Sequence, residues 1–223
     1  MGLSMTSKDQ ITRIRIVYSK KGMLRFNGHL DMQRLWERAL RRASLPVRYS
    51  QGFHPKARLN LASALPLGYI SRCEVLDFWL DQPLALDQIQ NSLTYTLPTD
   101  LQILDLSQVP NDLPALQTLV TASEYQVHFF QAPDTIELTQ KATHLLSQTE
   151  ILHTKRNKTY NLRETLEHLE VINLDDQPAL FMRMSSRPGA TGRPDEIITY
   201  LGYDPHACLI ERIKLIYREA LFE

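Results

Sequence analysis

The chain has 223 residues, of which 43% are hydrophobic and 22% are charged, and its formal net charge is zero. This composition is typical of a globular protein and excludes collagen-like, low-complexity and intrinsically disordered chains. Two cysteines, Cys73 and Cys208, are too few for a disulfide framework, a cysteine-rich zinc site or an iron–sulfur cluster held by this chain alone.

The cysteines and the N-terminus indicate a compartment. Two lone thiols suit a reducing environment. Residues 1–10 lack the apolar core of a signal peptide, and no stretch of about 18 apolar residues is present. We therefore expect a cytoplasmic protein with no membrane partner.

Basic residues are concentrated near the start of the chain. Residues 1–60 contain 13 Lys and Arg against three Asp and Glu, a net charge of +10, which leaves −10 for the remainder. Such asymmetry is typical of a chain with a polyanion-binding end. The alternative is that the two parts neutralise each other in the fold.

The first half predicts alternating strands and helices. Residues 12–18 alternate with period two and predict a strand, and residues 29–43 carry apolar side chains at helical spacing. A polar loop marked by Pro and Gly follows at 47–58. The next predicted elements are strands at 59–62 and 73–81, a helix at 84–97 and a strand at 100–106. This β-α-β-β-α-β order is the ferredoxin-like order.

The second half predicts a similar order after a linker. Residues 108–118 contain two prolines and no periodicity, which favours a linker. The elements predicted after it are strands at 123–130, 149–155 and 179–185, and helices at 134–147 and from Pro194 to Gly202. Residues 209–218 are predicted as a strand, with a helix as the alternative. Within 156–174, Leu162, Leu166 and Leu169 have helical spacing, whereas Thr159–Leu162 could pair as a strand.

The predicted fold class is therefore α+β. We expect two tandem ferredoxin-like modules, at residues 11–107 and 119–223, joined by the 108–118 linker, with an insertion in the second module.

The predicted 29–43 helix carries a row of arginines opposite its apolar face. Arg34, Arg38 and Arg41 follow at i, i+4 and i+7, and Arg42 lies beside them. Guanidinium groups at this spacing suit successive phosphates. The alternative is a solvated helix face.

The 47–58 loop interleaves basic and aromatic side chains. Its candidate RNA-binding residues are Arg48, Tyr49, His54, Lys56 and Arg58. Single-stranded nucleic acid is bound by such combinations of backbone neutralisation and ring stacking. For Phe53 we favour a hydrophobic anchor that fixes the loop.

The predicted sheet has a second face that opposes its apolar residues. This face is expected to be open and available to RNA if the helices cover the other one. The residues that fall on it are Arg13, Arg15, Arg58, Asn60, Asp77 and Trp79. An exposed Trp79 could stack on a base, but we prefer packing against the second module for this residue.

A further phosphate site is a weaker hypothesis. Residues 183–194 combine Arg183, Arg187 and Arg193 with Gly189 and Gly192 before a helix start. Their spacing matches neither the Walker A loop nor G-x-G-x-x-G.

Catalytic patterns are mostly missing from the sequence. It has no H-E-x-x-H and no G-x-S-x-G, and its seven histidines are scattered. His29, near the start of the basic helix, is a candidate acid or base for metal-free RNA cleavage.

Six short segments of the first half carry a family resemblance. They are Leu24-Arg25-Phe26, His29-Leu30-Asp31, Glu37 to Ala43, Gln51 to Pro55, Ala64 to Gly68, and Glu74. Together they resemble the bacterial radical-SAM-linked domain of unknown function, which is found as a small protein or fused to a radical SAM protein. The resemblance covers most of residues 12–81. The sequence departs from it at Lys56-Ala57, where the family tends to repeat a proline.

The resemblance implies a partner more than a reaction. A radical SAM protein, in cis or in trans, would supply the iron–sulfur cluster and S-adenosylmethionine, and no cofactor is expected in this chain. Genes of the family often lie near an RNase E/G-type ribonuclease, which suits RNA as a partner. Our first hypothesis is an accessory module, without catalytic activity of its own, that binds tRNA or rRNA for that enzyme. The alternatives are a protein-interaction module that docks on the radical SAM partner without RNA, and a metal-free ribonuclease.

Overall fold

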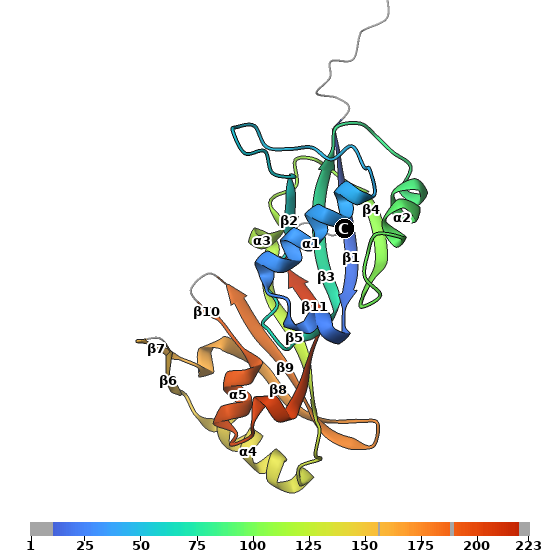
Figure 1. Cartoon of the computed structure of the whole chain (residues 1–223). Helices are drawn as coiled ribbons and strands as arrows, with labels where there is room; N and C mark the ends of the chain where they lie inside the picture. The colour runs from blue at the N-terminus through green and yellow to red at the C-terminus, as the bar shows by residue number, and fades with distance from the viewer. Residues whose placement is uncertain (1–10, 156, 188–189, 219–223) are drawn as a thin grey trace, which may run out of the picture. The chain divides into compact units, whose positions relative to one another are not determined.

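The computed structural model describes residues 11–155, 157–187 and 190–218 (Figure 1). The chain divides into two compact units. Within the described residues, unit 1 comprises 11–67 and 73–119, and unit 2 comprises 68–72 and 120–218. Strands and helices are mixed in both units, so the α+β prediction is confirmed.

Unit 1 contains four strands and two longer helices. Their order along the chain is β1 (Thr12–Lys20), α1 (His29–Arg42), β2 (Leu59–Leu61), β3 (Ile70–Leu80), α2 (Leu86–Thr94) and β4 (Leu101–Val109). A 3-10 turn, η2 (Gly22–Phe26), precedes α1, and the short helix α3 (Leu116–Leu119) follows β4. The strands lie side by side in the order β4-β1-β3-β2. β1 pairs antiparallel with β4, and β2 pairs antiparallel with β3.

One hydrophobic core joins both helices of unit 1 to one face of its sheet. Ile14, Ile16 and Tyr18 of β1 pack with Leu76, Phe78 and Leu80 of β3, with Met32, Trp36 and Leu40 of α1, and with Ile89 and Leu93 of α2. Figure 1 shows α1 lying across β1 and β3. The period-two pattern of β1 and the helical pattern of α1 therefore meet in a single interior, as the sequence predicts.

Unit 2 contains the remaining elements. These are β5 (Val120–Phe129), α4 (Thr135–Ser147), β6 (Leu152–Lys155), β7 (Lys158–Asn161), η3 (Arg163–Thr165), β8 (Leu166–Leu174), β9 (Gln177–Arg187), β10 (Ala190–Thr191), α5 (Pro194–Tyr200), η4 (Pro205–Ala207) and β11 (Cys208–Tyr217). Strands β8, β9, β5 and β11 lie side by side in that order and pair antiparallel. Residues Ile70 and Ser71, at the start of β3, pair parallel with β11.

The structure corrects the prediction for residues 149–174. The strand expected at 149–155 begins at Leu152 and belongs to a separate β6–β7 hairpin. Leu166 and Leu169, which have helical spacing, lie in strand β8. The register of β8 on β9 shifts between Leu166 and His168, and this bulge leaves both leucines buried although they are three residues apart.

Residues 108–118, expected to form a linker, contain the end of β4 and the start of α3. The carbonyl oxygens of Leu113 and Pro114 accept hydrogen bonds from the guanidinium group of Arg13. This segment therefore belongs to unit 1 and packs against β1.

Candidate nucleic-acid interface

Helix α1 places its arginines opposite a buried face. Met32, Trp36, Ala39 and Leu40 are buried, which fixes the rotation of the helix. The carboxylate of Asp31 accepts a hydrogen bond from the backbone N–H of Gly28 at 3.2 Å, which helps to define the start of the helix. The arginines, which are Arg34, Arg38, Arg41 and Arg42, are all exposed.

The contacts of these arginines leave them available to a ligand. Arg34 lies 3.9 Å from the carboxylate of Asp31, and both side chains are more than half exposed. Arg38 donates to the carbonyl of Arg34, and Arg42 donates to the carbonyl of Thr96. The Arg41 guanidinium group makes no ion pair or hydrogen bond within the described part of the chain. Because exposed ion pairs are worth at most about 1 kcal/mol, a phosphate can replace these contacts.

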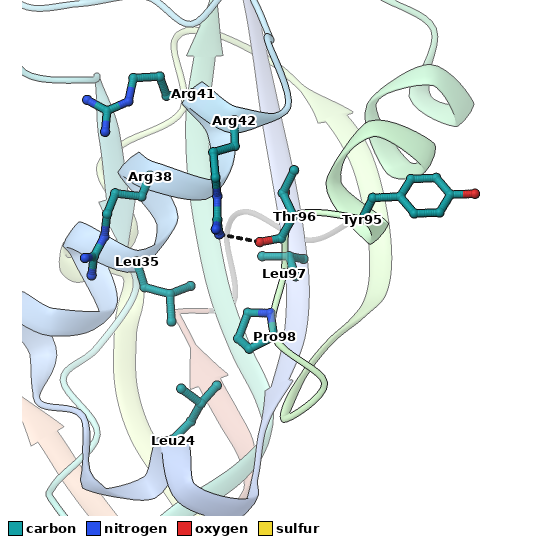
Figure 2. A pocket seen from close by; sticks show the side chains of 9 residues that line it. All are labelled: Leu24, Leu35, Arg38, Arg41, Arg42, Tyr95, Thr96, Leu97 and Pro98. Carbon is teal, nitrogen blue, oxygen red and sulfur yellow. Dashed lines mark hydrogen bonds between the residues drawn. The ribbon is translucent and has the colours of Figure 1, made fainter.

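A groove of about 520 Å³ separates α1 from the segment that follows α2. It is lined by Leu24, Leu35, Arg38, Arg41, Arg42 and residues 95–98. Figure 2 shows Arg42 reaching across the groove to Thr96, while Arg38 and Arg41 extend along the outer edge of α1. Tyr95 projects outward from the opposite edge (Figure 2) and is 91% exposed. The groove thus combines an apolar floor with a cationic rim.

The 47–58 loop is a closed, hairpin-like segment. Its two arms are joined by a bridge between Tyr49 and Ala57 and by hydrogen bonds between the backbones of Ser50 and Lys56 and of Arg48 and Arg58. The loop encloses a hollow of about 310 Å³, lined by Arg48, Tyr49, Ser50, Gln51, Gly52, Pro55 and Asp81. At the tip, Gly52 has φ +135°, a conformation that side-chain-bearing residues rarely adopt.

The candidate residues of the loop fall into two groups. Arg48 donates to Asp81 at 2.8 Å, and Tyr49 lies beside it in the hollow. His54 and Lys56 are exposed and do not line the hollow. Phe53 is fully exposed, so the interpretation of this ring as a hydrophobic anchor is wrong.

Arg58 connects the loop to the sheet. Its guanidinium group lies 4.2 Å from the centre of the Trp79 ring. Partial burial lowers the pKa of Arg58, and the positive charges of Arg48 and Arg13 lower it further. Arg48 and Arg13 are themselves paired with Asp81 and Asp77, so Arg58 is the member of this group for which no carboxylate partner is found among the described residues.

The second face of the unit 1 sheet is buried, which corrects the expectation of an open RNA-binding face. Asp77 is inaccessible and accepts hydrogen bonds from Arg13 and Arg15 at 2.8 Å. Trp79 is 3% exposed and lies under the guanidinium group of Arg13 as well as that of Arg58. Because Arg13 also binds the carbonyls of residues 113 and 114, this face is covered and cannot stack RNA bases.

The arginines of residues 183–194 have carboxylate partners. Arg183 contacts Glu124 at 2.6 Å, Arg187 lies 3.8 Å from Glu167, and Arg193 contacts Asp195 at 3.0 Å. A Cβ atom on Gly192 would lie 2.7 Å from the Thr165 carbonyl, so this glycine serves close packing. Gly189 lies outside the described residues. The described part of this segment does not form a phosphate cradle.

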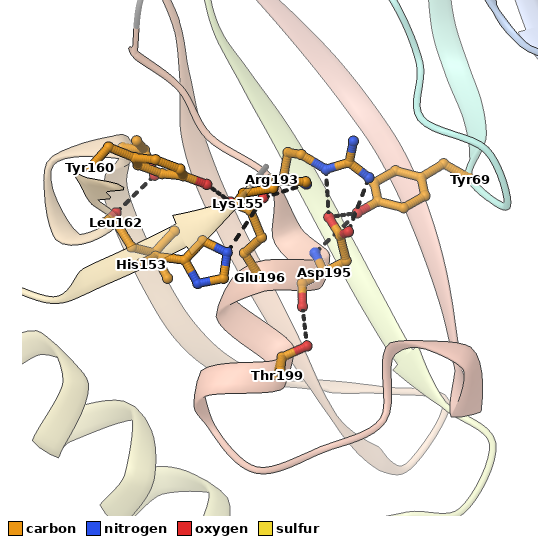
Figure 3. Close-up of polar contacts among 10 residues, drawn as sticks. Tyr69, His153, Lys155, Tyr160, Leu162, Arg193, Asp195, Glu196 and Thr199 are labelled. Atoms are coloured by element: carbon orange, nitrogen blue, oxygen red, sulfur yellow. Dashed lines mark hydrogen bonds and ion pairs between the residues drawn. The ribbon is translucent and has the colours of Figure 1, made fainter. Parts of the chain in front are cut away.

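A polar cluster in unit 2 surrounds the start of α5 (Figure 3). The buried carboxylate of Glu196 accepts hydrogen bonds from Lys155 at 2.6 Å and from the Tyr160 hydroxyl. His153 lies 3.9 Å from the same carboxylate. Burial and the contact with Glu196 raise the pKa of Tyr160 above its usual range. Because His153, Lys155 and Tyr160 all come from the β6–β7 hairpin, Glu196 fastens that hairpin to α5.

The neighbouring carboxylate holds the 68–72 segment in unit 2. Asp195 accepts hydrogen bonds from the Tyr69 hydroxyl at 2.8 Å and from Arg193 at 3.0 Å. Burial alone would raise the pKa of Asp195, but the hydrogen bonds and charge of Arg193, together with Tyr69, outweigh it and lower this pKa. Burial and Asp195 raise the pKa of Tyr69. The contacts of this cluster account for its conformation without a ligand.

His29, the candidate acid or base, lines a small cavity. Lys20, Glu74 and Ser63 line the same cavity, whose volume is about 10 Å³. That space suits about one water molecule. A scissile phosphate does not fit there, and the ribonuclease hypothesis gains no support from this geometry.

The structure gathers part of the predicted site and adds residues to it. Arg38, Arg41 and Arg42 share the groove, and Arg48 and Tyr49 share the loop hollow. Arg34, His54, Lys56 and Arg58 line neither space. Tyr95, Leu97 and Pro98 also line the groove, and none of them was among the predicted site residues. A signal for Tyr95 existed, since it lies off the apolar face of the helix predicted at 84–97.

Comparison with solved structures finds similarity to chains of two complexes. A chain in the crystal structure of a Cbf5–Nop10–Gar1 complex matches with a TM-score of 0.44 and 13% identity, over 91% of this chain and 48% of that chain. A chain in the crystal structure of the archaeal box H/ACA sRNP Nop10–Cbf5 complex matches with a TM-score of 0.43 and 11% identity, over 92% of this chain and 49% of that one. The chain thus spans about half the length of these two structural matches.

No curated protein sequence shows a significant match to the chain. Among the described residues, no helix combines the length and apolarity needed to cross a membrane.

A family model described as "Uncharacterized protein conserved in bacteria (DUF2344)" matches residues 13–194, which is most of the sequence. The chain belongs to this bacterial family.

Proposed function

We propose that the protein is a cytoplasmic RNA-binding module that presents tRNA or rRNA to a radical SAM modification enzyme. The observation that carries the RNA-binding part is the exposed arginine row of α1 at the rim of an apolar groove. Phosphates are recognised by such guanidinium groups, and unpaired bases require apolar or aromatic contacts. The 47–58 loop supplies a second basic and aromatic surface in the same unit.

The radical SAM partner is proposed from the sequence resemblance. That partner, fused to this chain or separate from it, would carry the iron–sulfur cluster and S-adenosylmethionine. This chain's part is to bind and orient RNA, and it needs no catalytic group of its own for that task.

We also propose that the two units are ferredoxin-like domains. The β4-β1-β3-β2 order of unit 1 supports this assignment. In unit 2, β5, β8, β9 and β11 taken as strands one to four have the equivalent order, with the β6–β7 hairpin as the insertion.

The decisive experiment measures RNA binding across a salt series. Fluorescence anisotropy of bulk tRNA and of an rRNA fragment is compared for the wild type and a variant with Arg34, Arg38, Arg41 and Arg42 changed to Ala. A control variant removes four exposed or half-exposed cations of unit 2, namely Arg72, Lys141, Arg183 and Arg187. Both variants change the net charge by four, so they separate a specific surface from general electrostatic attraction.

Each phosphate contact contributes roughly 0.7 to 0.9 to the slope of log K against log salt. Loss of four contacts should therefore reduce that slope by about 3 in the α1 variant and leave it nearly unchanged in the control. Wild-type binding that does not weaken with rising salt, or equal losses in both variants, would refute the proposal.

A protein-interaction module is the second candidate. Four large apolar side chains near the start of α1 favour it, because Met23, Phe26, Leu30 and Leu67 are all more than half exposed. Co-purification with the radical SAM protein that survives nuclease treatment, combined with no RNA binding at low salt, would support this alternative.

A further inference from the structure

The α1 groove has the features of a site for one exposed base rather than for a duplex. Its volume of about 520 Å³ is within the range of small-ligand sites. Leu24, Leu35 and Leu97 pack against the core on one side and stay partly exposed to the groove on the other. A duplex keeps its bases paired and stacked, so an RNA that covers this apolar floor must offer an unpaired base.

Positive charge lies where the backbone of such a nucleotide would run. Arg38 and Arg41 follow the outer edge of α1, and Arg42 spans the groove by its hydrogen bond to the Thr96 carbonyl (Figure 2). The Arg41 side chain makes no hydrogen bond or ion pair in the described structure, so its guanidinium group can take a phosphate without losing an existing partner. The charge of the rim therefore complements an RNA backbone passing over an apolar floor.

Tyr95 supplies an aromatic ring at the other edge. It is 91% exposed and follows directly after α2, and its ring extends into solvent (Figure 2). Rotation of an exposed side chain between rotamers takes picoseconds to nanoseconds. The ring can therefore turn to stack on a base that enters the groove.

The lining offers few groups that could distinguish one base from another. The Thr96 hydroxyl donates to the Leu93 carbonyl, and the Thr96 carbonyl accepts from Arg42. The remaining lining residues are leucines, arginines, a proline and Tyr95. Stacking without base-edge hydrogen bonds tolerates every base.

We propose that the α1 groove binds a single unpaired nucleotide of RNA, with little preference for its base, between the apolar floor and Tyr95. This inference rests on the proposed RNA-binding function and specifies the class of RNA: a single-stranded or bulged segment.

The test uses a 12-nucleotide single-stranded RNA with 2-aminopurine at its centre and the duplex of the same sequence. Binding is measured for the wild type, Tyr95→Ala, Tyr95→Phe and the control Tyr200→Ala, which removes an exposed tyrosine of unit 2. All three variants change exposed side chains and should leave the fold intact.

Tyr95→Ala should weaken single-strand binding by about 5- to 150-fold, the usual effect of losing one stacked base. Tyr95→Phe and Tyr200→Ala should both bind the single strand with the affinity of the wild type. Duplex binding should be the same in all four proteins. The 2-aminopurine fluorescence should change when the wild type binds and change less with Tyr95→Ala.

Three results would overturn the inference. Single-strand affinity within twofold of the wild type in Tyr95→Ala would do so, as would equal losses for single strand and duplex. Displacement of the RNA by a peptide of Glu and Leu, together with no preference for single strands, would assign the groove to a protein partner instead. If the α1 arginine variant loses RNA while Tyr95→Ala does not, the proposed function stands without this site. If the wild type binds neither RNA at low salt, both fail.

Discussion

Replacing Asp77 by Asn should destabilise unit 1 severely. Its carboxylate is inaccessible and contacts two buried guanidinium groups, with Arg13 and Arg15 donating at 2.8 Å each. Asparagine keeps the size of the side chain but removes the charge. Breaking a buried ion pair by changing one partner costs about 3–5 kcal/mol, because the other charge stays buried without compensation. Here two cations lose that carboxylate.

The magnitude is large relative to the stability of a protein of this size. Typical unfolding free energies are about 5–15 kcal/mol, and 1 kcal/mol shifts Tm by roughly 2–4 °C for 150–250 residues. Asp77→Asn should therefore lower Tm by roughly 6–20 °C. Thermal unfolding followed by circular dichroism measures this shift.

A matched control lies four residues further along the chain. Asp81 forms an ion pair with Arg48 in which the two side chains are 55% and 33% exposed. Asp81→Asn should cost less than about 1 kcal/mol, because water screens such pairs. Equal shifts in Tm for the two variants would refute the argument that burial makes the Asp77 cluster costly to break.

Three further predictions concern unit 2. Asp195→Asn should lower the unfolding free energy at pH 7; this deficit should persist down to the unfolded-state pKa of Asp195, about 4, and vanish as the pH falls through its lower folded-state pKa. Urea unfolding at pH 7, 5 and 3 tests this, and a deficit independent of pH contradicts it. Burial and the charge of Asp204 raise the pKa of the Cys208 thiol to about 11. Iodoacetamide at pH 8 should therefore label this thiol far more slowly in the folded protein than in urea, and peptide mass spectrometry measures the two rates. Glu196→Gln should raise amide hydrogen exchange in β6 and β7 and leave the β5–β9 pairing protected, because Lys155 and Tyr160 lose their charged acceptor. Unchanged exchange in these two strands would contradict the fastening role.

The sequence predicts elements best where one side of the element is buried. The helix expected at 29–43 is α1, His29–Arg42, because the apolar spacing from Met32 to Leu40 reflects contact with the sheet. The arginine row follows from the same geometry, since residues opposite a buried stripe are exposed. The groove beside it depends on residues 95–98, about 60 positions away, and no local pattern could place them next to α1.

Two errors have physical causes. A bulge in β8 gives Leu166 and Leu169 a spacing of three on one buried face, which imitates a helical repeat. Arg13, Arg15 and Asp77 look like solvent-facing residues because ionic side chains are rarely buried. Their mutual pairing, and the cover supplied by the aperiodic 108–118 segment, make burial possible here, and neither is visible in the local sequence.

The assignment of residues 68–72 to unit 2 has a consequence for synthesis on the ribosome. The described residues of unit 1 have all been made once residue 119 is complete, but Ile70 and Ser71 pair with Glu211 and Arg212 of β11. At about 5–20 residues per second, these two residues wait roughly 7–28 seconds for that strand. During this interval the edge they will offer to β11 lacks its partner strand, and an unpaired edge of this kind can pair with another chain.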